Sequence, residues 1–281
     1  MPGNNIATLY LRVDPVHPEA GAIEKAGLIL RRGGLVAFPT ETVYGLGANA
    51  LDGSAVARIF KAKGRPSDNP IIVHVACREQ VGLLTGSFPD SAKALTDAFW
   101  PGPLTLILPV GKGVPEAVTA GLQTVAVRMP GHPVALALIR AAGVPVAAPS
   151  ANLSGRPSPT SAEHVLQDLN GRIEVILDGG PAGIGVESTV LDLTSQAPVV
   201  LRPGGITPED LRGVLGEVEV DPAAAAGFYN GDRPRSPGMK YPHYAPRAPL
   251  QLVIGKPEAA AAKIKELAGK EKAGGRRVGI L

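Results

Sequence analysis

The chain is built from short apolar runs that end at glycine or proline. Four of them, LVAF at 35–38, IIVHV at 71–75, LTLILP at 104–109 and VAVRM at 125–129, have the length and composition of buried strands. The sequence holds 35 glycines and 28 prolines among 281 residues, well above the roughly 12% that the two contribute on average. Such frequent breaks argue against a coiled coil or a bundle of long helices, and the 44% apolar content argues against a disordered chain.

Amphipathic stretches alternate with these runs. Helices are predicted at 18–32, 54–63, 90–98, 133–142 and 207–215, with another ending near Leu169, and further strands at 144–149, 173–177, 188–193 and 198–202. Because turns join some strands and helices join others, the predicted fold class is α/β with a mixed, α+β-like sheet. This organisation fills residues 1–217. A proline-rich linker is expected at 218–247 and a strand–helix–strand unit at 248–281, its helix at about 257–268.

Composition and motifs narrow the function classes. With 28 basic and 25 acidic residues, the net charge of +3 permits an RNA partner without indicating one. Cys77 is the single cysteine and the five histidines are scattered, so neither a disulfide within the chain nor a clustered metal site is expected. No run of 18 apolar residues and no signal-peptide pattern occur, so we expect a soluble, cytoplasmic protein without a membrane partner. The stretch GLGANA at 45–50 fits a loose dinucleotide-binding pattern, but it lacks the acidic residue that should follow and is predicted to be a simple turn.

Polar side chains collect where the predicted strands end. The strings are PTETVYGLG at 39–47, KAKGRPSDNP at 61–70, VAVRMPG at 125–131, APSANLSGRPSPT at 148–160, VESTV at 186–190 and VLRPGG at 200–205. Each alone is explained as well by turn hydrogen bonds, helix capping or a salt bridge at the rim. Their common position at strand ends favours one assembled site. Several cations and small hydroxyls, with no evident nucleophile or metal cage, fit a nucleoside polyphosphate and a transfer reaction based on positioning and charge neutralisation.

In this order, these strings and FWPGPLTLIL at 99–108 resemble the YrdC family of threonylcarbamoyl-AMP synthases. The string SPGMKYPHYAP at 236–246 is similar to the linker of the family's long form, which implies that the C-terminal domain at 248–281 is incomplete. The resemblance implies a twisted sheet around a concave basic cavity that condenses L-threonine, bicarbonate and ATP to threonylcarbamoyl-AMP and pyrophosphate. Mg²⁺ would accompany ATP without a dedicated protein metal site. A separate tRNA-modifying threonylcarbamoyl transferase would use the product.

The resemblance also implies roles for residues of this sequence. The threonine pocket would comprise Thr42, His74, Arg128, Ser188 and the backbone at Ala148. ATP contacts would come from Arg65, Asn69, Thr124, Ser150, Ser158, Arg202 and, in the linker, Tyr241. A tetrad of Lys63, Arg65, Ser150 and Asn152 would form the catalytic group that stabilises the α-phosphate. The linker departs from the family at Pro242, where the long form usually has a basic residue.

Two other functions stay open on the sequence. A non-catalytic module that binds tRNA or double-stranded RNA agrees with the pI of about 9.0, although the 4% aromatic content offers few platforms for stacking bases. A relative that makes a different carbamoyl-adenylate, like the YrdC-like domain of hydrogenase-maturation carbamoyltransferases, is disfavoured by the linker string at 236–246.

Overall fold

A computed structural model describes residues 6–226, 236 and 249–280 of the chain. The chain divides into two compact units, residues 1–244 and 245–281. Most of the predicted linker, Tyr241 included, lies outside the described residues. Within the described ranges, no helix combines the length and apolar character needed to cross a lipid bilayer.

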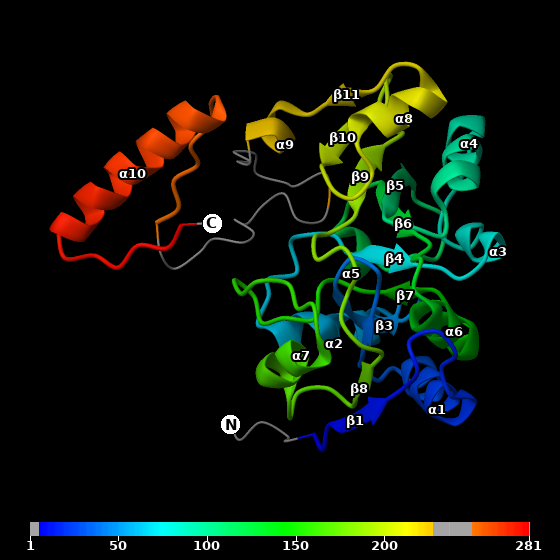
Figure 1. Ribbon diagram of the computed structural model, residues 1–281. Coiled ribbons are helices and arrows are strands. Elements are labelled where there is room, and N and C mark those ends of the chain that lie inside the picture. The colour runs from blue at the N-terminus through cyan, green and yellow to red at the C-terminus, as the bar shows by residue number, and fades with distance from the viewer. Residues whose placement is uncertain (1–5, 227–235, 237–248, 281) are drawn as a thin grey trace. The chain divides into compact units, whose positions relative to one another are not determined.

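The first unit is organised around a mixed sheet whose strands run in the order β1-β8-β2-β3-β7-β4-β6-β5-β9-β10-β11 (Figure 1). The strands are β1 Leu9–Arg12, β2 Val36–Pro39, β3 Tyr44–Asn49, β4 Ile72–His74, β5 Leu104–Pro109, β6 Thr124–Arg128, β7 Val146–Ala147, β8 Val175–Asp178, β9 Thr189–Asp192, β10 Val199–Arg202 and β11 Glu219–Val220. Strand β4 pairs in parallel with β6 and antiparallel with β7. The predicted mixed α/β sheet is therefore confirmed.

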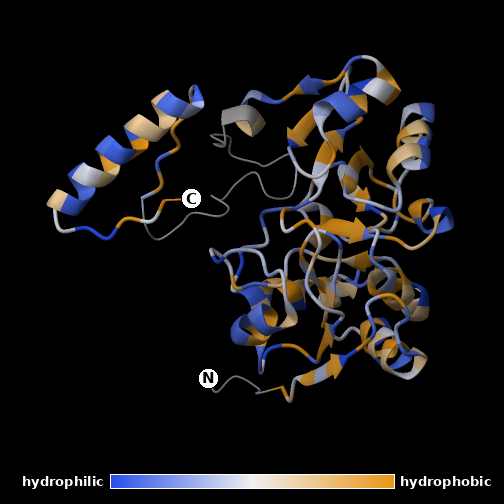
Figure 2. Ribbon diagram, viewed as in Figure 1, coloured by the Kyte–Doolittle hydropathy of each residue, from blue (hydrophilic) through white to orange (hydrophobic). Residues whose placement is uncertain are grey.

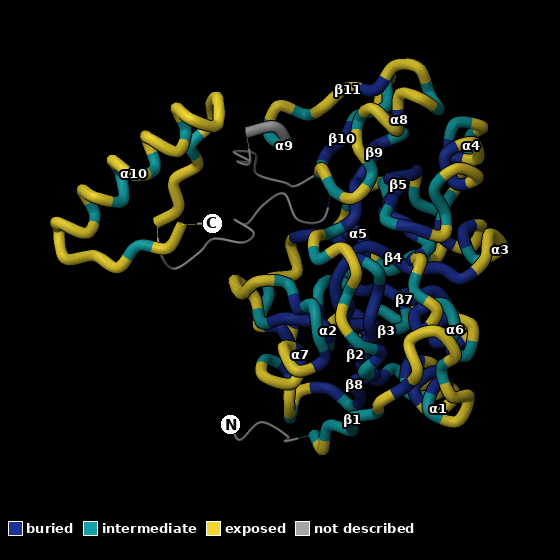
Figure 3. Tube along the Cα trace, viewed as in Figure 1, coloured by how far each residue is buried: buried dark blue, intermediate teal, exposed yellow. Residues whose placement is uncertain are grey.

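Helices cover both faces of this sheet, and β2 shows why. Along β2, Val36 and Phe38 belong to the apolar cluster that contains α1 and α6, whereas Ala37 belongs to the cluster of α2 and α7. Both faces of the strand are therefore buried, as its continuous apolar run requires (Figures 2 and 3). The helices are α1 Ala20–Arg31, α2 Gly53–Lys63, α3 Arg78–Val81, α4 Asp90–Phe99, α5 Glu116–Thr119, α6 Pro133–Ala142, α7 Ala162–Leu169, α8 Pro208–Leu215, α9 Pro222–Ala226 and, in the second unit, α10 Pro257–Ala273.

The stretch at 45–50 is mostly strand, so the predicted turn there is wrong. Strand β3 runs antiparallel to β2 through Gly45 and Gly47. A side chain on Gly47 would place its Cβ 2.8 Å from Val146 and 2.9 Å from Phe38, so glycine serves close packing at this position. The predicted strand at 144–149 shortens to the two residues of β7, because the chain turns away to form part of the site.

The second unit differs from its prediction. Helix α10 is confirmed and extends to Ala273, beyond the predicted end near 268. The flanking segments 249–256 and 274–280 contain no strand, because no neighbouring strand in the described part of this unit pairs with them. At the other end of the predicted linker, β11 pairs with β10 and α9 follows it, so residues 219–226 continue the first unit.

Candidate functional site

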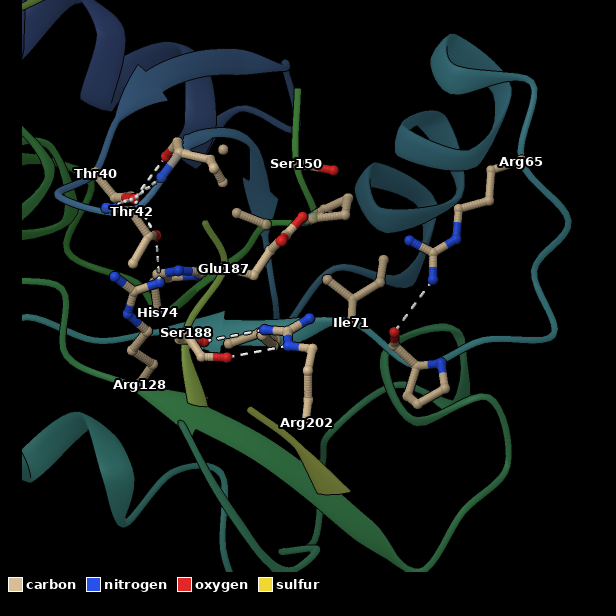
Figure 4. Close-up of a pocket in the computed structure, with 16 residues that line it drawn as sticks. Thr40, Thr42, Arg65, Ile71, His74, Arg128, Ser150, Glu187, Ser188 and Arg202 are labelled. Carbon is tan, nitrogen blue, oxygen red and sulfur yellow. Dashed lines mark hydrogen bonds between the residues drawn. The ribbon is translucent and has the colours of Figure 1, made fainter. Parts of the chain in front are cut away.

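A pocket with about 570 Å³ of space, open to solvent, lies where the predicted polar strings meet (Figure 4). Loops and strand ends from β2 to β10 contribute the lining residues Thr40, Thr42, Val43, Gly45, Arg65, Pro70, Ile71, Ile72, His74, Arg128, Ala148, Pro149, Ser150, Glu187, Ser188 and Arg202. Eight of the residues proposed from the sequence are among them: Thr42, Arg65, His74, Ala148, Ser150, Arg128, Ser188 and Arg202.

The turn between β2 and β3 forms one wall of the pocket. Thr40 Oγ1 accepts the backbone N–H groups of Thr42 at 3.3 Å and Val43 at 3.2 Å, and it lies 2.9 Å from Thr42 Oγ1. These local bonds are typical of threonine in a turn. They fix the Thr42 hydroxyl, which accepts a hydrogen bond at 3.0 Å from Nη1 of Arg128.

Arg128 closes strand β6 and is held by three groups. Besides the bond to Thr42, its Nε donates to the carbonyl of Gly102 at 3.2 Å, and its Nη2 lies 2.7 Å from a carboxylate oxygen of Glu41. The side chain is only 4% exposed. A buried guanidinium at a pocket wall is suited to a planar anion such as a carboxylate.

His74 is the register partner of Arg128 in the parallel pair β4–β6. Burial, with a smaller contribution from the Arg128 guanidinium, lowers the pKa of His74 to about 3. The imidazole is therefore neutral at physiological pH. Its Nδ1 is buried and has no hydrogen-bond partner among the described residues, and the ring meets Phe38 edge-on with centroids 6.1 Å apart. We call Thr42, His74 and Arg128 the Arg128 end of the pocket.

Two further arginines supply positive charge to the same pocket. Arg202, at the end of β10, donates from Nε to the carbonyl of Ser188 at 3.0 Å and from Nη2 to its hydroxyl at 3.1 Å. Burial lowers the pKa of Arg202 to about 10, against an opposing effect of Glu187, so the side chain stays charged at neutral pH. Arg65 follows α2 and donates from Nη2 to the carbonyls of Asn69 at 3.1 Å and Pro70 at 3.4 Å.

Lys63 contacts the loop at 150–156, to which Asn152 belongs, and neither side chain lines the pocket. Helix α2 ends at Lys63 because Gly64 takes the left-handed conformation with φ 61°. Lys63 Nζ donates to the carbonyl of Ser150, to the carbonyl of Asn152 at 2.6 Å and to the side-chain oxygen of Asn152 at 3.3 Å. An ammonium has three donors, so this one is saturated. Burial, aided by Arg65, lowers the pKa of Lys63 to about 7.

Asn152 is saturated in the same way. Its Nδ2 donates to the carbonyls of Leu153 at 2.9 Å and Arg156 at 2.8 Å. Of the four tetrad residues, Arg65 and Ser150 line the pocket, and Lys63 and Asn152 hold the loop behind it. We call these four residues the loop end of the pocket.

The remaining residues proposed from the sequence lie around this centre. Ser158 does not line the pocket, but its hydroxyl donates to Glu187, which does, at 2.6 Å. Asn69 is buried, and its side-chain oxygen has no hydrogen-bond partner among the described residues. Thr124 begins β6 opposite Pro109 and does not line the pocket. The N–H of Ala148 donates to the carbonyl of Ile72 at 2.9 Å, which places Ala148 at the pocket wall.

The polar strings contain Thr40, Glu41 and Glu187, but sequence reasoning assigned none of the three a role with threonine or ATP. Thr40 and Glu187 adjoin predicted site residues, and that adjacency was the available signal. Glu41 pairs with Arg128, which is distant in the sequence: Thr42, the next residue after Glu41, is 86 positions from Arg128. Local sequence spacing therefore does not predict this contact.

The fold is that of an α/β protein with a mixed sheet, and its site is a pocket lined by three arginines, Arg65, Arg128 and Arg202. Residues 28–204 match the family of Sua5, YciO and YrdC, described as "Telomere recombination", and residues 206–281 match "Threonylcarbamoyl-AMP synthase, C-terminal domain". The chain belongs to this Sua5/YrdC family, as its polar strings predicted.

Named relatives agree with this membership. The chain is 58% identical over 260 residues to the threonylcarbamoyl-AMP synthase of Bacillus subtilis, covering 92% of this chain and 73% of that protein. It is 36% identical to the threonylcarbamoyl-AMP synthase of Halorhodospira halophila, covering 62% of this chain and 92% of that protein. The structure of Pyrococcus abyssi Sua5 complexed with L-threonine matches with a TM-score of 0.91 and 52% identity, covering 98% of this chain and 79% of that one.

Proposed function

We propose that the chain is an L-threonylcarbamoyl-adenylate synthase, a nucleotidyltransferase that joins L-threonine, bicarbonate and ATP. Support comes from the names of its relatives and from the P. abyssi structure complexed with L-threonine. The observation that carries the proposal is that one pocket combines Arg128 and a neutral His74 with two further arginines, Arg65 and Arg202. Such a pocket offers one subsite for an amino acid and another for phosphates.

The Arg128 end would bind threonine. The Arg128 guanidinium would bind the carboxylate, and the open Nδ1 of His74 would bind a polar hydrogen of the substrate, since a neutral imidazole nitrogen can accept one. Thr42, Ser188 and the backbone at Ala148 would complete this subsite.

The rest of the pocket would bind ATP. Arg65, Arg202 and Ser150 line it and would contact the phosphates. Asn69, Thr124, Ser158 and Tyr241 remain proposals for the nucleotide, and Tyr241 lies outside the described residues. In the described parts of the chain no three metal-ligating side chains cluster. Mg²⁺ fits here as a companion of the ATP phosphates, which supply most of its ligands.

The chemistry requires two bonds to form in turn. The amine of threonine attacks the carbon of bicarbonate, water leaves and a carbamate forms. A carbamate oxygen then attacks the α-phosphorus of ATP, the bond to the bridging oxygen breaks and pyrophosphate leaves. Arg65 and Arg202 would offset the negative charge at the phosphates, and no covalent bond to the protein is needed.

The proposal extends to the fate of the product. A separate transferase would pass the threonylcarbamoyl group to an adenosine of tRNA, and the reaction would take place in the cytoplasm, where ATP and tRNA meet. Direct binding of tRNA by this chain is the alternative function. The pocket favours the synthase because Arg128 and His74 would suit an amino acid, while Arg65 and Arg202 would suit phosphates.

Pyrophosphate release tests the proposal. The full chain is incubated with Mg²⁺, ATP, L-threonine and bicarbonate, and each substrate is omitted in turn. We expect release only when all three are present. Background release in the complete mixture would overturn the proposal, and salt-dependent binding of tRNA without affinity for ATP would establish the RNA-binding alternative.

A further inference from the structure

Glu41 sits in the turn between β2 and β3, yet its carboxylate does not line the pocket. Its Oε1 lies 2.7 Å from Arg128 Nη2, and the two side chains are 18% and 4% exposed. Both carboxylate oxygens are buried and lack a hydrogen bond within the described residues. Arg128 therefore lies between the Glu41 carboxylate and the pocket.

The surroundings of the carboxylate make Arg128 its electrostatic partner. A further ionisable neighbour is His132, where burial lowers the pKa against an opposing effect of Glu41, so this imidazole is neutral near pH 7. A Cβ on Gly131 would lie 3.6 Å from Glu41 Oε1, which shows how closely the backbone encloses the carboxylate. Burial of this kind makes an unpaired charge costly, so the pair is held together.

The backbone of the same turn is also fixed. The carbonyl of Glu41 accepts the N–H of Ile184 at 2.8 Å, and the carbonyl of Thr42 accepts the N–H of Gly185 at 2.9 Å. The turn is therefore tied to the loop that leads to Ser188 in the pocket. The backbone of Glu41 is therefore held in place, and so is the position from which its carboxylate contacts the Arg128 guanidinium.

We propose that Glu41 is a positioning residue that orients the Arg128 guanidinium from behind, so that its outer edge meets the carboxylate of the amino-acid substrate. This inference rests on the proposed function, because it names what sets the amino-acid subsite. Thr42 and Gly102 fix Nη1 and Nε, and Glu41 adds the third point, which removes the remaining rotation of the group. A guanidinium that is already oriented lowers the entropic cost of binding the substrate.

The test compares L-threonine with L-threoninol, in which an alcohol replaces the carboxylate. Isothermal titration with the full chain measures both ligands and ATP, for the natural protein and for Glu41→Gln. We expect the preference for threonine over threoninol to fall at least tenfold in the variant, with the affinity for ATP changed by less than a factor of three. A purely structural role would weaken both amino-acid ligands and ATP together.

A second variant covers the case in which Glu41→Gln fails to fold. Glu41→Asp keeps the charge that compensates Arg128 but shortens the reach by one methylene, and we expect its preference for threonine to fall at least threefold. The matched control is Glu174→Gln, because Glu174 also pairs with an arginine, Arg58, and does not line the pocket. Its preference should equal that of the natural protein.

The outcomes separate two failures. If the natural protein binds neither threonine nor ATP, the proposed function is wrong. If it binds both and the Glu41 variants keep or increase the preference for threonine, the positioning role is wrong while the proposed function stands.

Discussion

The two ends of the pocket use polar side chains in opposite ways. At the Arg128 end, His74 Nδ1 is buried beside the pocket without a hydrogen bond among the described residues. At the loop end, Lys63 Nζ and Asn152 Nδ2 both donate their hydrogen bonds to oxygens of the loop at 150–156. Buried polar atoms normally find partners. A buried polar atom without a partner therefore indicates a place for a ligand. Side chains whose donors are all used within the protein indicate a structural role.

This difference changes how a polar sequence string should be interpreted. Lys63, Arg65, Ser150 and Asn152 come from two strings that the sequence treats alike, but two of these side chains line the pocket and two hold the loop. Loss of a pocket residue should remove binding of one ligand, whereas loss of a loop-holding residue should loosen a segment first and affect the ligand through it.

The largest effect is expected from Arg128→Met. Loss of one partner of a buried, hydrogen-bonded charge pair costs roughly 2–5 kcal/mol, so the Kd for L-threonine should rise by about a hundredfold. Titration calorimetry measures it, with ATP affinity as the internal check on folding. If threonine binds this variant as it binds the natural protein, the Arg128 end is not the amino-acid subsite.

A smaller effect with a different signature is expected from Lys63→Met. Methionine fills the space but leaves the oxygens of Ser150 and Asn152 without donors, which costs about 1–3 kcal/mol for each buried group left unpaired. Turnover should fall by about tenfold, and the N–H of Ser154, which donates to the Lys63 carbonyl at 3.0 Å, should exchange faster with deuterium.

The control for this variant is Lys61→Met, because Lys61 is an exposed residue in the last turn of the same helix. It should change neither turnover nor exchange. Reduced turnover in Lys63→Met with unchanged exchange at 150–156 would instead place Lys63 in direct contact with substrate.

The depressed pKa of Lys63 also predicts how stability depends on pH. With a folded-state pKa of about 7 against 10.5 in the unfolded chain, the unfolded state binds more protons between these values. The contribution of Lys63 to the free energy of unfolding should therefore be constant below about pH 6 and rise from pH 7 towards pH 9. Urea unfolding of the natural protein and of Lys63→Met gives this contribution as a difference. A difference that is flat or falls over that range would contradict the assigned pKa.

The smallest effect is expected from Ser158→Ala. The Ser158 hydroxyl donates to Glu187 at 2.6 Å, and its loss leaves a carboxylate with one bond fewer at the phosphate side of the pocket. A hydrogen bond to a charged group contributes about 1.5–3 kcal/mol. Because Ser158 acts on ATP only through Glu187, a part of that energy reaches the ligand, and the Kd for ATP should rise by about threefold with threonine affinity unchanged. A rise in the Kd for threonine instead would assign Ser158 to the other end.

Much of the fold could be predicted because most of its strands are continuous apolar runs. Strand β3 was not predicted, because Gly45 and Gly47 have no side chain whose apolar character would indicate a buried strand. The two strands expected beside α10 follow the same apolar pattern, but a strand also needs a neighbour, and sequence pattern does not report one. In the site, the strings located most of the residues that line the pocket, and the family resemblance added His74. The direction of Lys63 and the pairing of Glu41 with Arg128 depend on how distant segments pack, which no local spacing records.

Formation of the mixed product tests the central claim most directly, namely that one pocket joins an amino acid to a nucleotide. The natural full chain is incubated with ATP, L-threonine and ¹³C-bicarbonate, and adenylates are resolved by mass spectrometry. We predict a threonylcarbamoyl-adenylate that carries the ¹³C label, with pyrophosphate in equal amount. Binding of both ligands without any labelled adenylate would contradict the account.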